Sequence, residues 1–249
     1  MSEWLFDLGN TRLKCAPLID GKVGDVIALP HRQADLADAL ANALPMHIDA
    51  AYVASVANEH LRVALLQALT QHARRISIAR TQKTFGDFRI AYAQPQKLGV
   101  DRFLAMLAAH AHAHARGEGA VLLCGVGTAL TIDLIDAQGC HVGGRIAPSP
   151  TLMREVLHAR APQLPEEGGH YMDFAADTED ALASGCEGAA LALIEASREA
   201  AHRMLGQRPK LLVHGGGVDG LADRLPDASR AASLVLEGLA IWARFGSTP

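Results

Sequence analysis

The feature that most constrains this sequence is a pattern of strands and turns that occurs twice. Three short strands open each half, and a turn of small residues separates the first strand from the second. We expect these strands over residues 3–7, 12–19 and 23–29, and again over residues 121–126, 129–136 and 141–147. Helical segments and a further strand follow in both halves. The repetition predicts a duplicated α/β fold with two similar lobes and mixed sheets.

Length and pattern together suggest where the two lobes meet. A chain of 249 residues can form one large core or two smaller ones. A helix expected over residues 101–115 would join the halves. We therefore predict an N-terminal lobe over residues 1–100 and a C-terminal lobe, including the joining helix, over residues 101–249.

Composition excludes several classes of partner and location. The net charge is −4 and no basic stripe is visible, so no nucleic-acid partner is expected. No apolar run approaches the roughly 20 residues that span a bilayer, and the N-terminus does not resemble a signal peptide, so no membrane partner is expected. The four cysteines form no CxxC pair. This pattern favours a reducing, cytoplasmic location.

The first small-residue turn lies within the segment Asp7-Leu8-Gly9-Asn10-Thr11-Arg12-Leu13-Lys14. Small residues let backbone N–H groups approach a phosphate, and the Asn10 and Thr11 side chains add donors. The Asp7 carboxylate suits Mg²⁺. An ordinary hairpin uses the same residue types, so this turn alone leaves both interpretations open.

Two further glycine turns lie in the second half. Gly127-Thr128 separates two apolar strands, as the first turn does, and the glycines of residues 215–217 follow another strand. Turns at equivalent points of two similar halves could together bind one polyphosphate. The sequence contains neither GxxxxGK[ST] nor a GxGxxG after a strand, which argues against a P-loop NTPase and against a dinucleotide-binding Rossmann fold.

An acid–base candidate occurs where a Pro- and Gly-containing loop enters a helix, in the segment Gly99-Val100-Asp101-Arg102. Asp101 could accept the proton of a substrate hydroxyl that attacks a phosphoryl group, and Arg102 could bind a substrate carboxylate. Aspartate is also a favoured helix N-cap. The residues alone do not separate catalysis from capping.

The motifs Asp7-x-Gly-Asn-Thr-Arg, Gly99-x-Asp-Arg and Gly127-Thr-Ala-x-Thr-x-Asp occur in one order across nearly the whole chain. Together with Gly143-Gly144-x-Ile146-x-Pro148, Asp177-Thr178, Gly215-Gly216-Gly217 and Leu236-Glu237-Gly238-Leu239, they resemble the type III pantothenate kinases. That family belongs to the acetate kinase, sugar kinase, Hsp70 and actin superfamily. The resemblance implies a duplicated actin-like, ribonuclease H-like fold.

The resemblance also implies an activity, which is ATP-dependent phosphorylation of pantothenate to 4'-phosphopantothenate, the first step of coenzyme A biosynthesis. It implies a homodimer, Asp101 as the catalytic base, Mg²⁺ at Asp7, and a monovalent cation, K⁺ or NH₄⁺. The implied ATP-binding residues are Asp7, Gly9, Asn10, Thr11, Arg12, Lys14, Thr128, Gly215 and Gly216. The implied pantothenate-binding residues are Tyr92, Gly99, Val100, Asp101, Arg102 and Thr178, and Thr178 could come from the same subunit or from the other one.

The sequence departs from the family pattern at two positions. The family's Asp-x-Gly-Thr carboxylate, which is associated with the monovalent cation, is replaced by Gly125. The cation site is then either absent or formed by carbonyls and waters. Ser149 replaces the glycine of the family's Pro-Gly pair.

Two alternatives to pantothenate phosphorylation remain at this stage. One is another kinase or a phosphatase on the same fold. The other is an accessory or regulatory protein with weak or no catalysis, which Gly125 favours and the intact segment around Asp101 disfavours.

Three histidines, His110, His112 and His114, alternate with alanine in the joining helix. His110 and His114 share a helix face and could bind a metal. No HExxH pattern accompanies them, so surface or interface packing is the favoured interpretation.

Overall fold

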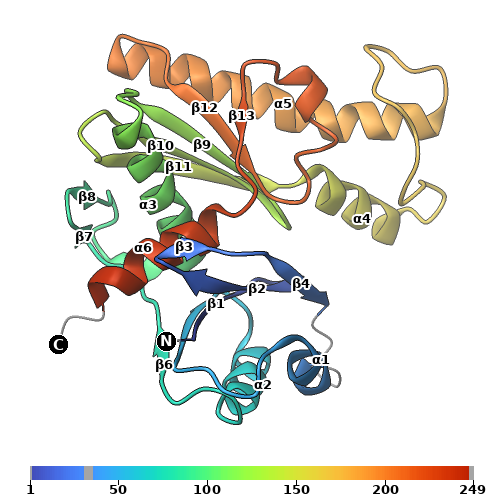
Figure 1. The fold of residues 1–249 in the computed structure, drawn as a ribbon. Helices are drawn as coiled ribbons and strands as arrows, with labels where there is room; N and C mark the ends of the chain where they lie inside the picture. The colour runs from blue at the N-terminus through green and yellow to red at the C-terminus, as the bar shows by residue number, and fades with distance from the viewer. Residues whose placement is uncertain (1, 31–35, 247–249) are drawn as a thin grey trace. The chain divides into compact units, whose positions relative to one another are not determined.

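The computed structural model describes residues 2–30 and 36–246. The chain divides into two compact units, one formed by Met1–His112 with Ser233–Pro249 and the other by Ala113–Ala232. Figure 1 labels the elements of both units.

The first unit is built on a six-stranded sheet. Its strands are β1 (Glu3–Leu8), β2 (Arg12–Ile19), β3 (Lys22–Val23), β4 (Ile27–Pro30), β5 (Ala50–Ser55) and β6 (Ile76–Ile78). Their order is β3-β2-β1-β5-β6, with β4 also paired to β2. β1 is antiparallel to β2 and parallel to β5. The Asp20-Gly21 turn between β2 and β3 has positive φ at both residues, as is typical of a tight hairpin.

Helices cover both faces of this sheet, with α1 (Leu36–Ala43) and α2 (Glu59–Leu69) on one side and α6 (Leu234–Gly246) on the other (Figure 1). Alternation along β1 places Phe6 and Leu8 in the core with α1 and α2. The intervening residue, Asp7, therefore faces away from that core.

The second unit repeats the strand order of the first. Its strands are β9 (Val121–Val126), β10 (Ala129–Ile135), β11 (His141–Pro148), β12 (Lys210–His214) and β13 (Ser229–Arg230). Their order is β11-β10-β9-β12-β13. Two helices, α4 (Pro150–Arg160) and α5 (Thr178–Leu205), and the short 3₁₀ helix η2 (Ala222–Arg224) complete the unit. Buried apolar residues of α5 pack against β9, β10 and β12.

The predicted duplicated fold is thus confirmed, with one local correction. The third strand expected over residues 23–29 is two strands, β3 and β4. The chain is interrupted at Gly24, whose N–H donates to the Pro17 carbonyl at 2.9 Å. A Cβ at Gly24 would lie 2.8 Å from the Pro17 ring, so this close approach of the chain to Pro17 depends on glycine.

The remaining elements of the first unit are the hairpin β7 (Thr84–Phe85) and β8 (Phe88–Arg89), the 3₁₀ turn η1 (Pro95–Lys97) and helix α3 (Val100–Ala115). The sequence pattern divided the chain between residues 100 and 101, whereas the compact units group most of α3, and all of α6, with the first sheet. A Cβ at Gly238 of α6 would collide with the Leu104 carbonyl of α3. That close approach explains the glycine of the Leu236-Glu237-Gly238-Leu239 motif.

Within the described ranges, no helix is both long enough and apolar enough to cross a membrane. The four cysteines are free thiols, and Cys15, Cys124 and Cys186 are buried.

Candidate active site

The first glycine turn joins β1 to β2 and is closed by its own backbone. The Gly9 N–H donates to the Arg12 carbonyl at 3.1 Å. Asp7 lies one residue before the end of β1 and is opposite Lys14 of β2. On the other side of β1, its neighbour in β5 is Ala54, which is small and uncharged. The register therefore places one carboxylate and one ammonium group beside the turn.

Asp7 is an unusual carboxylic acid. Burial, and to a lesser extent the negative charge of Asp101, raise its pKa to about 7, and Lys14 only partly opposes this. The Asp7 carboxyl therefore holds its proton to a much higher pH than an exposed carboxyl group does. Two carboxylates that repel one another in a half-buried setting fit a divalent cation, because the cation removes the repulsion.

Asp101 is held where α3 begins. The Arg102 N–H donates to Asp101 Oδ1 at 2.8 Å, and the first helical bond runs from the Phe103 N–H to the Gly99 carbonyl at 3.1 Å. A Cβ at Gly99 would lie 2.5 Å from Asp101 Oδ1. The glycine is therefore needed because the carboxylate occupies the space that a side chain would take.

This arrangement differs from ordinary helix capping. Asn58, Ser149 and Asp177 are N-caps whose side chains accept from the backbone N–H three residues later, which begins α2, α4 and α5. Asp101 is instead the second residue of α3 and accepts from the adjacent N–H. The capping interpretation left open by the sequence does not describe Asp101.

Arg102 is buried, with 8% of its surface exposed, and its guanidinium lies 3.5 Å from the Tyr92 hydroxyl. Lys83 fixes the loop that carries Tyr92. Its ammonium group donates to the carbonyls of Ile90 at 2.8 Å, Ala91 at 3.3 Å and Tyr92 at 3.0 Å. Sequence reasoning missed Lys83, since a lone lysine before a hairpin gives no signal of a carbonyl clamp.

The second unit brings two other predicted segments together. The Gly127 N–H donates to the Ala129 carbonyl at 3.0 Å, and the Ser149 hydroxyl donates to the Thr128 carbonyl at 3.0 Å. Ser149 thus stabilises the Thr128 turn and caps α4, which accounts for serine at this position. The Gly217 N–H donates to the Val126 carbonyl at 3.0 Å, and a Cβ at Gly215 would collide with the same carbonyl. The two glycine turns of this unit are therefore in contact.

Position 125 is crowded although it is a glycine. In the sheet, Gly125 is flanked by Thr131 of β10 and by His214 of β12. A Cβ at Gly125 would lie 2.8 Å from both Thr131 Oγ1 and His214 Nε2. The side chains of these neighbours occupy the space beside the glycine. Only the pairing of three strands reveals this, although His214 directly precedes the glycine run in the sequence.

The other residues of the motifs have structural partners. The Asp133 Oδ1 and His141 Nε2 atoms lie 3.1 Å apart, and both side chains are buried. Thr178 is the first residue of α5, is exposed, and follows the N-cap Asp177. It lies in the second unit, whereas Tyr92 and residues 99–102 lie in the first.

The histidines of α3 have separate carboxylate partners. His110 lies 3.3 Å from Asp87 and His112 lies 2.9 Å from Glu237. Among the described residues, no group of three or more His, Cys, Asp or Glu side chains could hold a metal ion.

Comparisons with known proteins agree with the motifs. A family model described as type III pantothenate kinase matches residues 4–200. Proteins named type III pantothenate kinase from Xylella fastidiosa (strain M23) and Stenotrophomonas maltophilia (strain K279a) are 52% and 55% identical over 243 residues, 98% of this chain and of each relative. The one from Xanthomonas axonopodis pv. citri (strain 306) is 53% identical over 249 residues and the full length of both chains.

Solved structures show the same fold at low sequence identity. A conserved Baf family protein from Campylobacter jejuni matches with a TM-score of 0.63 at 21% identity, over 98% of this chain and 99% of that one. The activator of the 2-hydroxyisocaproyl-CoA dehydratase from Clostridium difficile matches with a TM-score of 0.54 at 10% identity, over 99% and 95%. Because the family model and the full-length relatives agree, this chain belongs to the type III pantothenate kinase family.

Proposed function

We propose that this kinase phosphorylates pantothenate to 4'-phosphopantothenate with Asp101 as the proton acceptor. The activity follows from the family, and the role of Asp101 rests on one observation. Its carboxylate accepts a hydrogen bond from the Arg102 N–H and occupies the space that Gly99 leaves free. It does not cap the helix as the N-cap side chains of the other helices do. A rigidly placed carboxylate at a helix N-terminus is suited to position a hydroxyl for attack.

The reaction transfers the γ-phosphoryl group of ATP to the terminal hydroxyl of pantothenate. The hydroxyl oxygen forms a bond to the γ-phosphorus, and the bond from that phosphorus to the β,γ-bridging oxygen breaks, which releases ADP. Asp101 accepts the hydroxyl proton as the oxygen attacks. Positioning and charge neutralisation provide most of the catalysis in phosphoryl transfer.

Asp7 is the proposed carboxylate for Mg²⁺, directly or through water. The ion, when bound with ATP, neutralises charge on the phosphates. The raised pKa of Asp7 supports this assignment, because an unneutralised carboxylate beside Asp101 is unfavourable. Mg²⁺ commonly uses one or two carboxylates with waters and phosphate oxygens, so no larger ligand cluster is required.

Arg102 and Tyr92 are the proposed anchors for the pantothenate carboxylate, with Gly99 and Val100 forming the adjacent backbone. Arg102 has its guanidinium beside a neutral hydroxyl at Tyr92. A guanidinium can bind a carboxylate in a bidentate manner. Lys83 is a positioning residue in this scheme, since it holds the carbonyls of the segment that ends at Tyr92.

ATP recognition is assigned to the glycine turns. In this proposal Gly9, Asn10, Thr11, Arg12 and Lys14 serve the phosphates from the first unit, and Thr128 does so from the second. Gly215 and Gly216 let a nucleoside approach the backbone. The contact between the Gly215–Gly217 turn and Val126 supports a shared role for the two turns of the second unit.

The residues at position 125 do not fit a monovalent cation held by a side-chain carboxylate. Gly125 supplies no ligand, and Thr131 and His214 occupy the space beside it. We therefore derive no catalytic step through K⁺ or NH₄⁺ in this chain.

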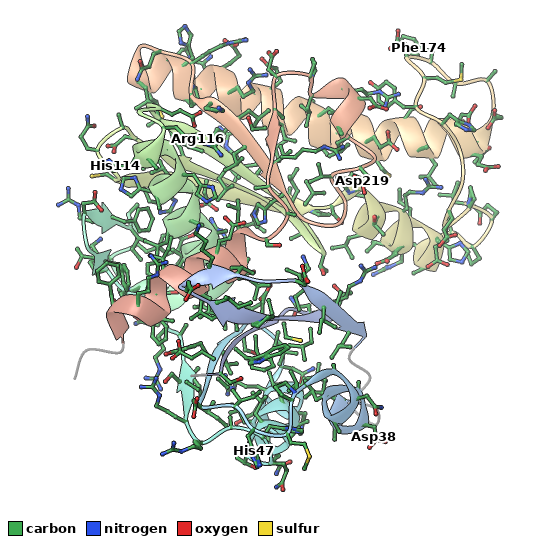
Figure 2. All side chains as sticks on the ribbon, in the orientation of Figure 1. Asp38, His47, His114, Arg116, Phe174 and Asp219 are labelled. Carbon is green, nitrogen blue, oxygen red and sulfur yellow. The ribbon has the colours of Figure 1, made fainter. Side chains whose placement is uncertain are left out.

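A homodimer and a cytoplasmic location are also proposed, with no nucleic-acid or membrane partner. Phe174, labelled in Figure 2, lies in the loop before α5 and is 97% exposed. Apolar side chains of α4 and α5, including Leu152 and Leu182, line a hollow of about 430 Å³. Burial of these surfaces by a second copy would be favourable, and Thr178 at the start of α5 would then complete the pantothenate site of that copy. The free thiols support a reducing compartment.

The experiment that tests the central proposal compares Asp101→Asn with the exposed-site control Asp219→Asn. ADP release with pantothenate and Mg-ATP should fall about 10²–10⁴-fold in Asp101→Asn, because the proton acceptor is lost. The control should retain its activity. ATP affinity, measured by calorimetry, should change little in either variant. Turnover of Asp101→Asn within a few-fold of the parent would reject the assignment.

A further inference from the structure

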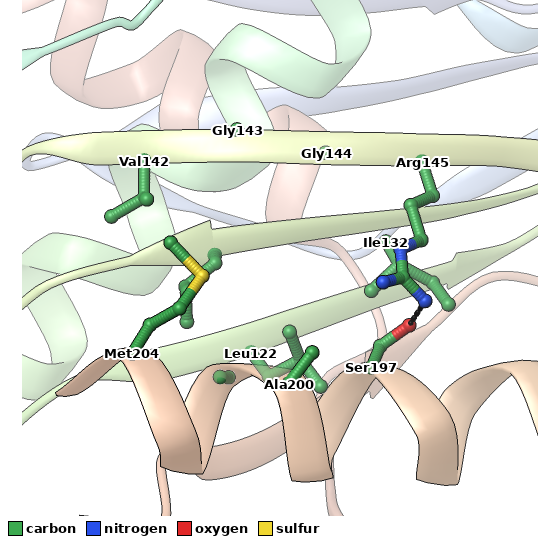
Figure 3. Close-up of a pocket in the computed structure, with 11 residues that line it drawn as sticks. Leu122, Ile132, Val142, Gly143, Gly144, Arg145, Ser197, Ala200 and Met204 are labelled. Carbon is green, nitrogen blue, oxygen red and sulfur yellow. Dashed lines mark hydrogen bonds between the residues drawn. The ribbon is translucent and has the colours of Figure 1, made fainter. Parts of the chain in front are cut away.

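A small hollow lies in the second unit, and none of its lining residues is assigned a role above. It is open to solvent, is lined by residues of β9, β10, β11 and the C-terminal half of α5, and has a volume of about 150 Å³ (Figure 3). Its walls are apolar except at one end. There Arg145 of β11 points toward Ser197 of α5.

The local backbone explains why this space is open. The register between β10 and β11 shifts between Leu134 and Ile135, which pair with Gly143 and His141 and leave Val142 as a bulge. Gly143 has a φ of +154°, and a Cβ added there would meet nothing within 4 Å. The Gly143-Gly144 pair, a family motif without a role in the kinase site, therefore forms one backbone wall of the hollow.

The polar end carries the guanidinium of Arg145, an exposed residue whose side chain contacts a hydroxyl rather than a carboxylate. Arg145 donates to the Ser197 hydroxyl at 3.0 Å, and that hydroxyl donates to the Leu193 carbonyl at 2.6 Å. Arginines elsewhere in this unit, such as Arg198 and Arg208, pair with carboxylates. Within the described ranges, the one polar partner of Arg145 is the neutral Ser197 hydroxyl.

The opposite end is apolar and adaptable. Leu134 of β10, which pairs with Gly143, and Met204 of α5 line this end, whereas Ile132 pairs with Arg145 at the polar end. Met204 is 64% exposed. A flexible thioether at the mouth of an apolar hollow can adjust to ligands of different shape.

We propose that this hollow binds a short aliphatic monocarboxylate of about four carbons. The carboxylate would pair with Arg145 and Ser197, and the alkyl chain would lie against Ile132, Leu134 and Met204. The volume of about 150 Å³ is small, which limits the ligand to a compact one. A charge-assisted bond to the guanidinium favours an anion over a neutral analogue of the same shape.

The test uses butyrate as the probe and the full-length protein with a ¹³C-methyl label on methionine. Pantothenate is kept at saturation, so that butyrate does not compete at Arg102, and ionic strength is constant. The Met204 methyl resonance, assigned with Met204→Leu, reports binding at the hollow. Butan-1-ol is the neutral probe, Arg145→Gln removes the charge, and Arg203→Gln is a matched control outside the hollow.

Butyrate should shift the Met204 resonance saturably and bind about tenfold more tightly than butan-1-ol. Arg145→Gln should abolish that preference, whereas Arg203→Gln should retain it. The proposal is overturned if butyrate causes no saturable shift, if butan-1-ol binds as well as butyrate, or if the preference survives in Arg145→Gln. The kinase assignment does not depend on any of these outcomes, because the hollow shares no residue with it.

Discussion

The two units have the same strand order but place charge differently beside their first turns. In the first unit, Asp7 lies between Lys14 and Ala54 in the sheet. In the second, the equivalent position is Gly125, which lies between Thr131 and His214. In the first unit the central strand and one flanking strand each carry an ionisable group, Asp7 and Lys14, whereas in the second unit the ionisable group, His214, is on a flanking strand. One backbone framework therefore supports two chemically different turns, because side chains rather than topology determine the local charge.

The largest effect should come from removing the charge of the first turn. Asp7→Asn should lower kcat/KM for Mg-ATP about 10²-fold or more, because a ligand of the metal is lost. In the parent enzyme, kcat/KM should fall as pH drops below about 7, approaching tenfold per unit, because Asp7 becomes protonated. The residual activity of Asp7→Asn should lack this dependence. A parent profile that is flat between pH 6 and pH 8 would contradict the role of Asp7.

Asp7→Asn, which should lower activity, should increase stability. The pKa of Asp7 is higher in the folded protein than in the unfolded chain, so folding is favoured by protonation and loses stability as pH rises from about 4 through 7. Asp7→Asn, which is neutral, should therefore raise the free energy of unfolding at pH 8, by the order of 1 kcal/mol for this half-buried group. The gain should shrink toward pH 4, and thermal melts without nucleotide measure it.

The crowding of the second turn predicts an intermediate effect. Gly125→Ala should destabilise the protein by about 1–3 kcal/mol, because the new Cβ lies 2.8 Å from both His214 and Thr131. His214→Ala should relieve part of the strain, so the double variant should be more stable than the sum of the single changes predicts. Ala54 of β5 lies beside Asp7 as His214 of β12 lies beside Gly125, so Ala54→Gly is the control for His214→Ala. Strict additivity in urea denaturation would count against the crowding.

A smaller effect is expected at the carbonyl clamp of the first unit. Lys83→Met should raise KM for pantothenate several-fold and change kcat little, because the Tyr92 segment loses three hydrogen bonds that position it. Lys83→Arg should restore part of the affinity. Lys97→Met also removes one positive charge, from the η1 turn that follows Tyr92, and serves as the control. An equal rise in KM for both variants would indicate a general electrostatic effect instead.

The smallest effect should come from exchanging the monovalent cation. Steady-state rates in KCl and in choline chloride of equal ionic strength should agree to within about twofold, since position 125 offers no carboxylate. The double variant Gly125→Asp/His214→Ala introduces a carboxylate and removes a side chain that crowds it. In this variant the ratio of the rate in KCl to the rate in choline chloride should increase. A strong requirement for K⁺ in the parent would show that carbonyls and waters form a cation site at this turn.

The sequence predicted the repeated succession of strands and helices along the chain, because that pattern has local causes. Apolar alternation favours strands such as β1 and β2, an Asp-Gly pair favours the tight turn at Asp20-Gly21, and an N-cap aspartate favours the start of α5 after Asp177. The split of the third strand was missed, because it depends on contact between Gly24 and Pro17. The return of α6 to the first unit was missed for a similar reason, since it depends on its close approach to α3 at Gly238.

In the candidate site, too, some properties follow from the sequence and others from tertiary contacts. The sequence by itself determined the residue types, namely the carboxylates Asp7 and Asp101, the guanidinium of Arg102 and the glycine turns, because motif spacing is a local property. Only the tertiary structure decided that Asp7 has a raised pKa, that Lys83 holds the Tyr92 loop, and that His214 crowds Gly125. These properties arise from burial and from strand pairing between distant segments, and no local pattern encodes either of them.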